Sequence, residues 1–226
     1  MRSALKVARA SWMATAGCAT TWRSWCSAWA GRARALGSRD VGGPRVERYL
    51  AHLDRVSGGM EPRFTRIAST SPELGGVTVI SYDGVPEPGM LTAFTYGLSL
   101  AQHPEWRLGK PELAISVRSL DFAWAHAIGG LAETLRGECA FAYGDTIDAR
   151  EPVAPDSALD AFVVFAPAVL GPGDYLGIDV GDALPVSIQG VYPIHRSELA
   201  YMREHGLEAF WNRDWDPYDV GRPPAV

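Results

Sequence analysis

The chain has 226 residues, 47% of them hydrophobic, which is enough for one domain with a substantial core, and no apolar run approaches the roughly 18 residues of a membrane-spanning helix. Its net charge of -5 is unevenly spread, because residues 1–45 hold eight Lys and Arg against one acidic residue, whereas the rest holds 13 against 25. Phosphate contacts need clustered Lys and Arg, so this acidic body argues against nucleic acid as the partner and is compatible with a basic protein.

The first 43 residues differ in composition from the rest and are interpreted as a separate basic leader. They are rich in Ala, Arg, Ser and Trp. Arg9 and Arg23 interrupt the apolar region that a secretory signal needs, while an organelle transit peptide would share the Arg- and Ser-rich composition. We expect a disordered leader, or an upstream extension from a misassigned start codon, followed by one domain over residues 44–226.

The cysteines and glycine-rich loops exclude several common sites. Cys18, Cys26 and Cys139 are odd in number and widely spaced, so they predict neither a disulfide framework nor a zinc site, and they fit a cytoplasmic protein. Neither GxGxxG nor GxxxxGK[ST] occurs in the chain. We therefore predict no cofactor and no metal.

The first half of the domain predicts one helix followed by strands. Pro44 suits a first helical turn, and apolar residues at helical spacing predict a helix over Arg45–Ser57. Asp83-Gly84 is a turn signal that makes its flanking strands an antiparallel pair. The predicted strands are Arg63–Ala68, Val77–Tyr82, Met90–Leu100 and Leu113–Arg118.

One apolar stripe predicts the next helix. It consists of Trp124, Ile128, Leu131 and Leu135. Asp121 can cap this helix and Gly137 can stop it. Within it, Gly129-Gly130 costs about 1 kcal/mol per glycine relative to alanine, which predicts close packing against the sheet or a bend.

The second half predicts more strands and a well-capped helix. Ala161–Ala166 is apolar on both faces and is expected to be central, with Tyr175–Ile178 as a short edge strand. Leu184–Tyr192 is a strand in which Gln189-Gly190 suggests a bulge. His195 at the N-cap and Glu198 at N3 predict a capping box, and Gly206 ends the helix as an αL residue. The predicted class is α+β: a single domain with a mixed, largely antiparallel sheet flanked by helices.

The sequence offers one weak catalytic pair. His126 and Glu133 lie seven residues apart on one predicted helix, so a hydrolase of unrecognised type using both is the alternative function, although further groups would be needed. Asp214, Asp216 and Asp219 do not follow the calcium-loop pattern. The acidic loop Asp145–Asp160 beside Tyr143 is the most interface-like surface, because aromatic residues are enriched in binding hot spots.

From about Arg45 to the C-terminus, the chain resembles the Suppressor of fused domain family, with its segments in the family's order. The segments that carry the resemblance are Ser116–Ser119, Ala125–Gly129, Tyr143–Ile147 (YGDTI), Phe162–Pro167 (FVVFAP), Leu176–Asp179, Leu184–Glu198, Gly206–Phe210 and Asp219–Pro223 (DVGRP). One departure is Gly221, where a basic residue is expected before Arg222, so the resemblance leaves an ionic role of the tail open.

The resemblance implies an α+β fold and a non-catalytic, protein-binding function. Animal relatives bind and restrain a transcription factor through a peptide that adds a strand in a cleft. Bacterial single-domain members, which this chain resembles more closely, are thought of as immunity proteins that neutralise a secreted toxin. The partner-binding residues implied are Tyr143 and Asp145 in YGDT, and Tyr192 and His195 in the turn before the last long helix. The oligomeric state is left open.

Overall fold

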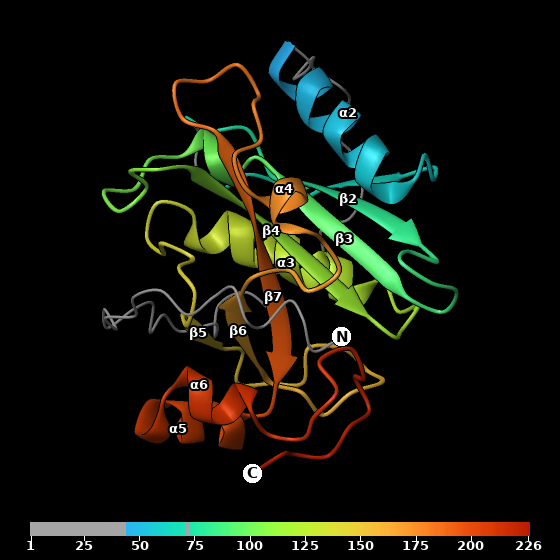
Figure 1. Ribbon diagram of the computed structural model, residues 1–226, viewed down its shortest axis with the longest axis vertical. Helices are drawn as coiled ribbons and strands as arrows, with labels where there is room; N and C mark the ends of the chain where they lie inside the picture. Colours follow the sequence, from blue (N-terminus) through green and yellow to red (C-terminus); the bar gives the residue numbers. More distant parts are fainter. Residues whose placement is uncertain (1–43, 71–72) are drawn as a thin grey trace.

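The computed structural model describes residues 44–70 and 73–226, so the predicted leader lies outside the described residues. The described residues form one seven-stranded sheet of order β1-β2-β3-β4-β7-β6-β5 (Figure 1). Its strands are β1 (Arg63–Arg66), β2 (Thr78–Asp83), β3 (Leu91–Tyr96), β4 (Lys110–Val117), β5 (Thr146–Asp148), β6 (Ala161–Phe165) and β7 (Val186–Ile194). Only the β4–β7 pair is parallel among these strands, which confirms the mixed, largely antiparallel sheet.

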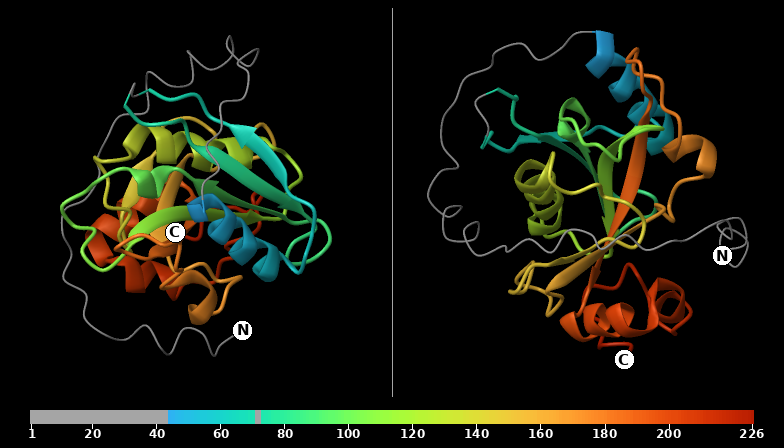
Figure 2. Two further views of the ribbon diagram at one scale, coloured as in Figure 1. Left: turned by 90° about the horizontal axis from the view of Figure 1, so that it is seen from above. Right: turned by 90° about the vertical axis from the view of Figure 1, so that its left-hand side faces the viewer.

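Helices cover both faces of the sheet, as the right-hand view of Figure 2 shows. They are α2 (Pro44–Ser57), α3 (Ala123–Leu135), α4 (Pro172–Tyr175), α5 (Arg196–His205) and α6 (Leu207–Trp211), with a short 3-10 helix, η3 (Leu98–Leu100). Helix α3 packs on one face, where Trp124 and Ile128 enter the largest core cluster. Helices α2 and α4 cover part of the opposite face, and α5 and α6 cover the remainder. No helix within the described residues is long and apolar enough to cross a membrane.

Strand β7 holds the two parts of the sheet together. Its first half pairs with β4, from Lys110 opposite Val186 to Ala114 opposite Gly190. Its second half pairs with β6, which places β6 between β7 and the edge strand β5. Ala161–Ala166 is therefore an interior strand, as its apolar residues predicted, although it lies next to the edge strand and not in the middle of the sheet. That segment is apolar on both faces because α3 covers one face and α5 with α6 covers the other.

The predicted strand Met90–Leu100 ends early, at Tyr96. Gly97 then adopts a φ of 128°, which favours glycine, and the chain enters η3. The carboxylate of Glu112 on β4 accepts hydrogen bonds from the amides of Gly97 and Ser99, at 2.9 and 3.1 Å. These bonds to a neighbouring strand hold the turn, so the local apolar pattern did not reveal the break.

Three further expectations are corrected. Tyr175–Ile178 is not a strand, because α4 ends at Tyr175 and only Ile178 bridges to Val186. Gln189-Gly190 keeps a regular register without a bulge; Gly190 is required because a Cβ there would lie 2.9 Å from the Cα of Pro167. Gly206 has a positive φ of 86°, but its ψ of 161° is not αL.

Gly129 confirms the close-packing interpretation of the glycine pair and provides a stability test. A Cβ at this position would lie 2.8 Å from Cγ1 of Ile67 and would also clash with Cγ2 of Val79, both buried side chains. Gly129→Ala is expected to lower the free energy of unfolding by about 1–2 kcal/mol in urea, because overpacking outweighs the gain in helix propensity. Gly173→Ala in α4 is the control, since nothing lies within 4 Å of its Cβ position. Equal stability of the two variants would contradict the close packing.

Candidate functional site

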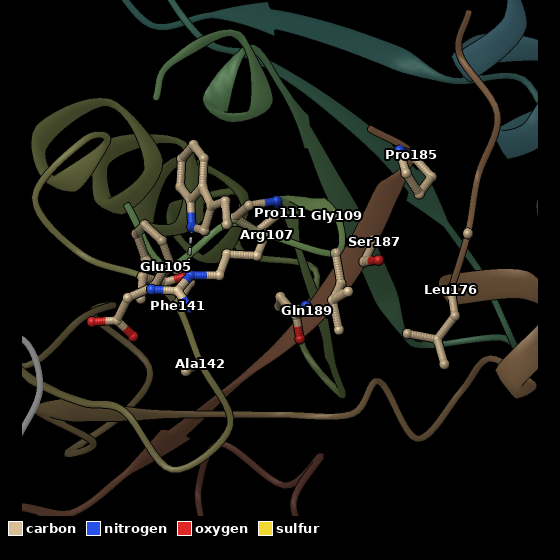
Figure 3. A pocket seen from close by; sticks show the side chains of 14 residues that line it. Glu105, Arg107, Gly109, Pro111, Phe141, Ala142, Leu176, Pro185, Ser187 and Gln189 are labelled. Atoms are coloured by element: carbon tan, nitrogen blue, oxygen red, sulfur yellow. Dashed lines mark hydrogen bonds between the residues drawn. The ribbon is translucent and has the colours of Figure 1, made fainter. Parts of the chain in front are cut away.

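An open groove of about 680 Å³ lies beside the start of β4 and β7 (Figure 3). Segments far apart in sequence form it: residues 105–109 before β4, residues 140–142 after α3, residues 176–177 after α4, and β7 itself. Its walls are largely apolar, with Trp106, Phe141, Leu176 and Pro185 among them. Leu108, at 91%, and Leu176, at 48%, are both exposed, so apolar surface is displayed around the groove. Such a volume lies within the range of about 300–1,000 Å³ of ligand sites.

Hydrogen bonds hold the Ala140–Ala142 wall in place. The indole N–H of Trp106 donates to the carbonyl oxygen of Ala140 at 2.9 Å. The amide of Ala142 donates to Oδ2 of Asp145 at 2.8 Å, and the amide of Phe141 donates to Sγ of Cys139 at 3.4 Å. Phe141 has a φ of 52°, which is uncommon for a non-glycine residue. These hydrogen bonds fix the conformation of the wall.

The Asp145 carboxylate is buried behind this wall and accepts a hydrogen bond from it. It is only 8% exposed, and burial raises its pKa, which the hydrogen bonds from the Ala142 amide and the Cys139 thiol oppose. The predicted partner-binding carboxylate therefore faces the adjoining backbone. It positions the Ala140–Ala142 segment.

Tyr143 and Tyr192 belong to one aromatic cluster, which we define as Tyr143, Phe165, Tyr192 and Trp211. The ring of Tyr143 lies 5.2 Å from that of Phe165, which lies 4.5 Å from Trp211, and Trp211 lies 5.1 Å from Tyr192. Tyr143, Phe165 and Trp211 are half-buried. Burial raises the pKa of the Tyr143 hydroxyl well above its ordinary value, as does its hydrogen bond with Tyr175.

Tyr192 is held both by its ring, which packs against Trp211, and by its hydroxyl group. It is 4% exposed, and its hydroxyl donates to the carbonyl oxygen of Ala166 and accepts from the amide of Ala168, both at 2.7 Å. These bonds fix the chain as it leaves β6. The family resemblance implied Tyr143 and Tyr192 as binding residues, and the structure joins their rings through Phe165 and Trp211.

His195 lies at the N-terminus of α5, where the predicted capping box forms. Its amide donates to the Glu198 carboxylate at 2.8 Å, and its Nε2 lies 3.0 Å from the carbonyl oxygen of Arg222. Both Nη atoms of Arg222 donate hydrogen bonds to the Glu198 carboxylate, at 2.5 and 2.7 Å. The arginine of the tail therefore forms its ion pair within the domain. His195 therefore connects α5 to the C-terminal segment.

Both residues of the alternative catalytic pair are engaged in contacts with other residues. Both carboxylate oxygens of Glu133 accept hydrogen bonds, from the Thr70 amide at 2.7 Å and the Val77 amide at 3.2 Å, and Arg136 pairs with it at 2.8 Å. The ring of His126 packs edge-on against Phe122 at 4.7 Å. Within the described residues, no group of three or more His, Cys, Asp or Glu side chains could hold a metal ion.

The sequence interpretation missed the groove residues Trp106, Leu108, Leu176 and Gln189. The signal available in the loop before β4 was Leu108, an apolar residue among Arg, Gly, Lys and Pro. No local pattern indicates that the Ala140–Ala142 segment and β7 lie beside this loop.

Comparison with known proteins identifies the fold and the family. The sequence model of the Suppressor of fused protein (SUFU) matches residues 74–223. A search of curated proteins gave no significant match.

Solved structures agree with this match. A Suppressor of fused homologue from Neisseria gonorrhoeae superposes with a TM-score of 0.62 at 18% identity, covering 80% of this chain and 96% of that chain. Drosophila Suppressor of Fused superposes with a TM-score of 0.61 at 14% identity, covering 84% of this chain and 54% of the Drosophila chain. A structure of the Sufu–Fu complex also matches, with a TM-score of 0.60 at 13% identity over 80% of this chain and 92% of that chain. Because the family model spans well over half of the sequence, the chain belongs to the Suppressor of fused family.

Proposed function

We propose that this protein is a non-catalytic protein-binding module that holds its partner in the groove beside β4 and β7. The observation that carries the proposal is the open, preformed groove, with Leu108 91% exposed beside its fixed Ala140–Ala142 wall. Exposed apolar surface of this kind marks interaction sites in monomeric proteins. The family supports the same function, since one matching structure is a Sufu–Fu complex.

The predicted binding residues take different parts in this proposal. Tyr143 offers a half-buried ring next to the groove wall, and Asp145 positions that wall. Tyr192 packs against Trp211 in the aromatic cluster and is held by its hydrogen bond to Ala166. His195 holds the C-terminal segment against α5. Binding energy would therefore come from exposed groove residues and Tyr143, with the other three residues maintaining the surface.

The partner we propose is a basic protein, and the biological role is that of an immunity protein which neutralises a toxin in the cytoplasm. The acidic excess after residue 45, 25 acidic residues against 13 Lys and Arg, supports a basic partner through electrostatic steering. The internal engagement of Glu133 supports binding over hydrolysis.

Photo-cross-linking from inside the groove tests this function. We expect benzoylphenylalanine placed at Leu108 or Leu176 of the full chain, expressed in its native host, to capture the same protein. Position 120 is the matched control, because Leu120 is 66% exposed but does not line the groove. Capture of that protein equally from position 120, or from neither groove position, would contradict the proposed site.

Affinity measurements complete the test once the captured protein is purified. Leu108→Asp is expected to weaken its binding at least about ten-fold, since it places a charge in an apolar contact, whereas Leu120→Asp should leave it unchanged. For the immunity role, co-expression should protect cells from the captured protein, and Leu108→Asp should reduce this protection. A captured protein that is harmless to cells would contradict immunity while leaving the binding module intact.

A further inference from the structure

The groove contains a polar group that the protein leaves unsatisfied. Gln189 on β7 is half-buried, and its side-chain oxygen Oε1 is buried without a hydrogen-bond partner among residues 44–70 and 73–226. Figure 3 shows this side chain between those of Phe141 and Leu176. An unpaired buried acceptor costs free energy, which a donor brought by a ligand would recover. Because Oε1 is buried, the terminal torsion of Gln189, which is broad in glutamine, must rotate for this oxygen to meet a donor in the groove.

The remaining groove residues favour a flat ring as the occupant. Three of the residues that line it carry rings: Phe141, Pro111 and Pro185. Arg107, also on the groove, is exposed and forms no ion pair with any residue in the described part of the chain. A guanidinium stacks on aromatic faces, so Arg107 favours an aromatic over an aliphatic side chain.

We propose that the groove binds a tyrosine or tryptophan side chain of the partner, whose hydroxyl or indole N–H donates a hydrogen bond to Oε1 of Gln189. This inference rests on the proposed protein-binding function and states which side chain of the partner the groove selects. The ring packs beside Arg107 and the proline rings, and the donor at its edge pairs the carbonyl that the free protein leaves unpaired. Phenylalanine and leucine fill the same space but bring no donor, so the groove discriminates against them.

Side-chain analogues test this discrimination without the partner. The full chain is titrated by NMR with p-cresol, the tyrosine analogue, and with toluene and 4-methylanisole, which lack a donor. We expect p-cresol to bind roughly five-fold more tightly than toluene or 4-methylanisole, as one hydrogen bond allows. Its shifts should centre on Gln189 and Trp106. Gln189→Met should abolish the preference while toluene still binds, and Gln102→Met, at an exposed position outside the groove, should retain it.

The outcomes separate this inference from the proposed function. Equal affinities for p-cresol and toluene, a preference that survives in Gln189→Met, or no binding of p-cresol would each overturn the inference. The cross-linking from positions 108 and 176 would still test the proposed function independently of these results. Conversely, a p-cresol preference that depends on Gln189, with no protein captured from the groove, would uphold the aromatic site and remove the proposed partner-binding role.

Discussion

Replacing Glu198 with alanine is expected to lower the free energy of unfolding by about 3–5 kcal/mol, because it leaves a buried arginine without its counter-charge. The Glu198 side chain is 0% exposed and that of Arg222 is 4% exposed. The substitution also removes the acceptor for the amides of His195 and Ala225. Urea denaturation of the full chain measures the loss, and hydrogen exchange should show the Ala225 amide losing protection.

The pH dependence of the free energy of unfolding is a second test of the Glu198–Arg222 pair. Burial raises the pKa of Glu198, but Arg222 and the amides of Ala225 and His195 outweigh burial and hold this pKa below its ordinary value. The contribution of Glu198 to the free energy of unfolding is therefore complete above its pKa in the unfolded chain, about 4.3. This contribution is lost as the pH falls through the lower pKa of the folded state. Glu198→Ala should lack this acid-induced loss.

Glu204 supplies the control on the same helix. Its side chain is 77% exposed, so Glu204→Ala should change the free energy of unfolding by no more than about 0.5 kcal/mol. A loss below about 1 kcal/mol for Glu198→Ala would show that Arg222 finds another partner or water, against the buried pair described above.

Glu133→Ala is expected to lower the free energy of unfolding by a similar amount, about 3–5 kcal/mol, for the same physical reason at another buried pair. The side chains of Glu133 and Arg136 are 1% and 3% exposed. Removing the carboxylate leaves Arg136 without its counter-charge and the amides of Thr70 and Val77 without their acceptor. Urea denaturation reports the stability, and hydrogen exchange at Thr70 and Val77 reports the release of the segment before β2.

Glu138→Ala is the matched control, since Glu138 is exposed and follows the same helix. Glu133→Gln separates charge from shape: it keeps one acceptor oxygen but removes the charge opposite Arg136, so its stability should fall between wild type and Glu133→Ala. Protection at Thr70 and Val77 that is unchanged in Glu133→Ala would contradict the role of this carboxylate as their anchor.

The features predicted from sequence are those whose signals are local. The capping box of α5 needs only His195 and Glu198, three residues apart, and it forms as predicted. The α3 stripe and the β2–β3 pair likewise depend on short spacings. By contrast, the η3 turn depends on Glu112 from the next strand, and the Glu198–Arg222 pair joins residues 24 apart.

The candidate site was predicted least well for the same reason. The YGDT segment lies beside the proposed groove, where Asp145 holds the Ala140–Ala142 wall, and its part in binding stays a prediction. However, the sequence pattern does not encode whether the Asp145 carboxylate faces solvent or, as the structure shows, the Ala142 amide and the Cys139 thiol. The groove exists only because β7 passes beside Ala140–Ala142, so Gln189 could not be recognised before the chain was folded.

The position of β7 has a consequence for synthesis of the chain. Strands β1 to β4 form a sequential meander that can pair as it leaves the ribosome, but the β7-facing edge of β4 finds its partner only after residue 186 has been made. Until then β4 and β6 present unpaired backbone and apolar faces, a state prone to aggregation. Such long-range pairing also slows folding, so the nascent chain is expected to depend on chaperones until β7 inserts between β4 and β6.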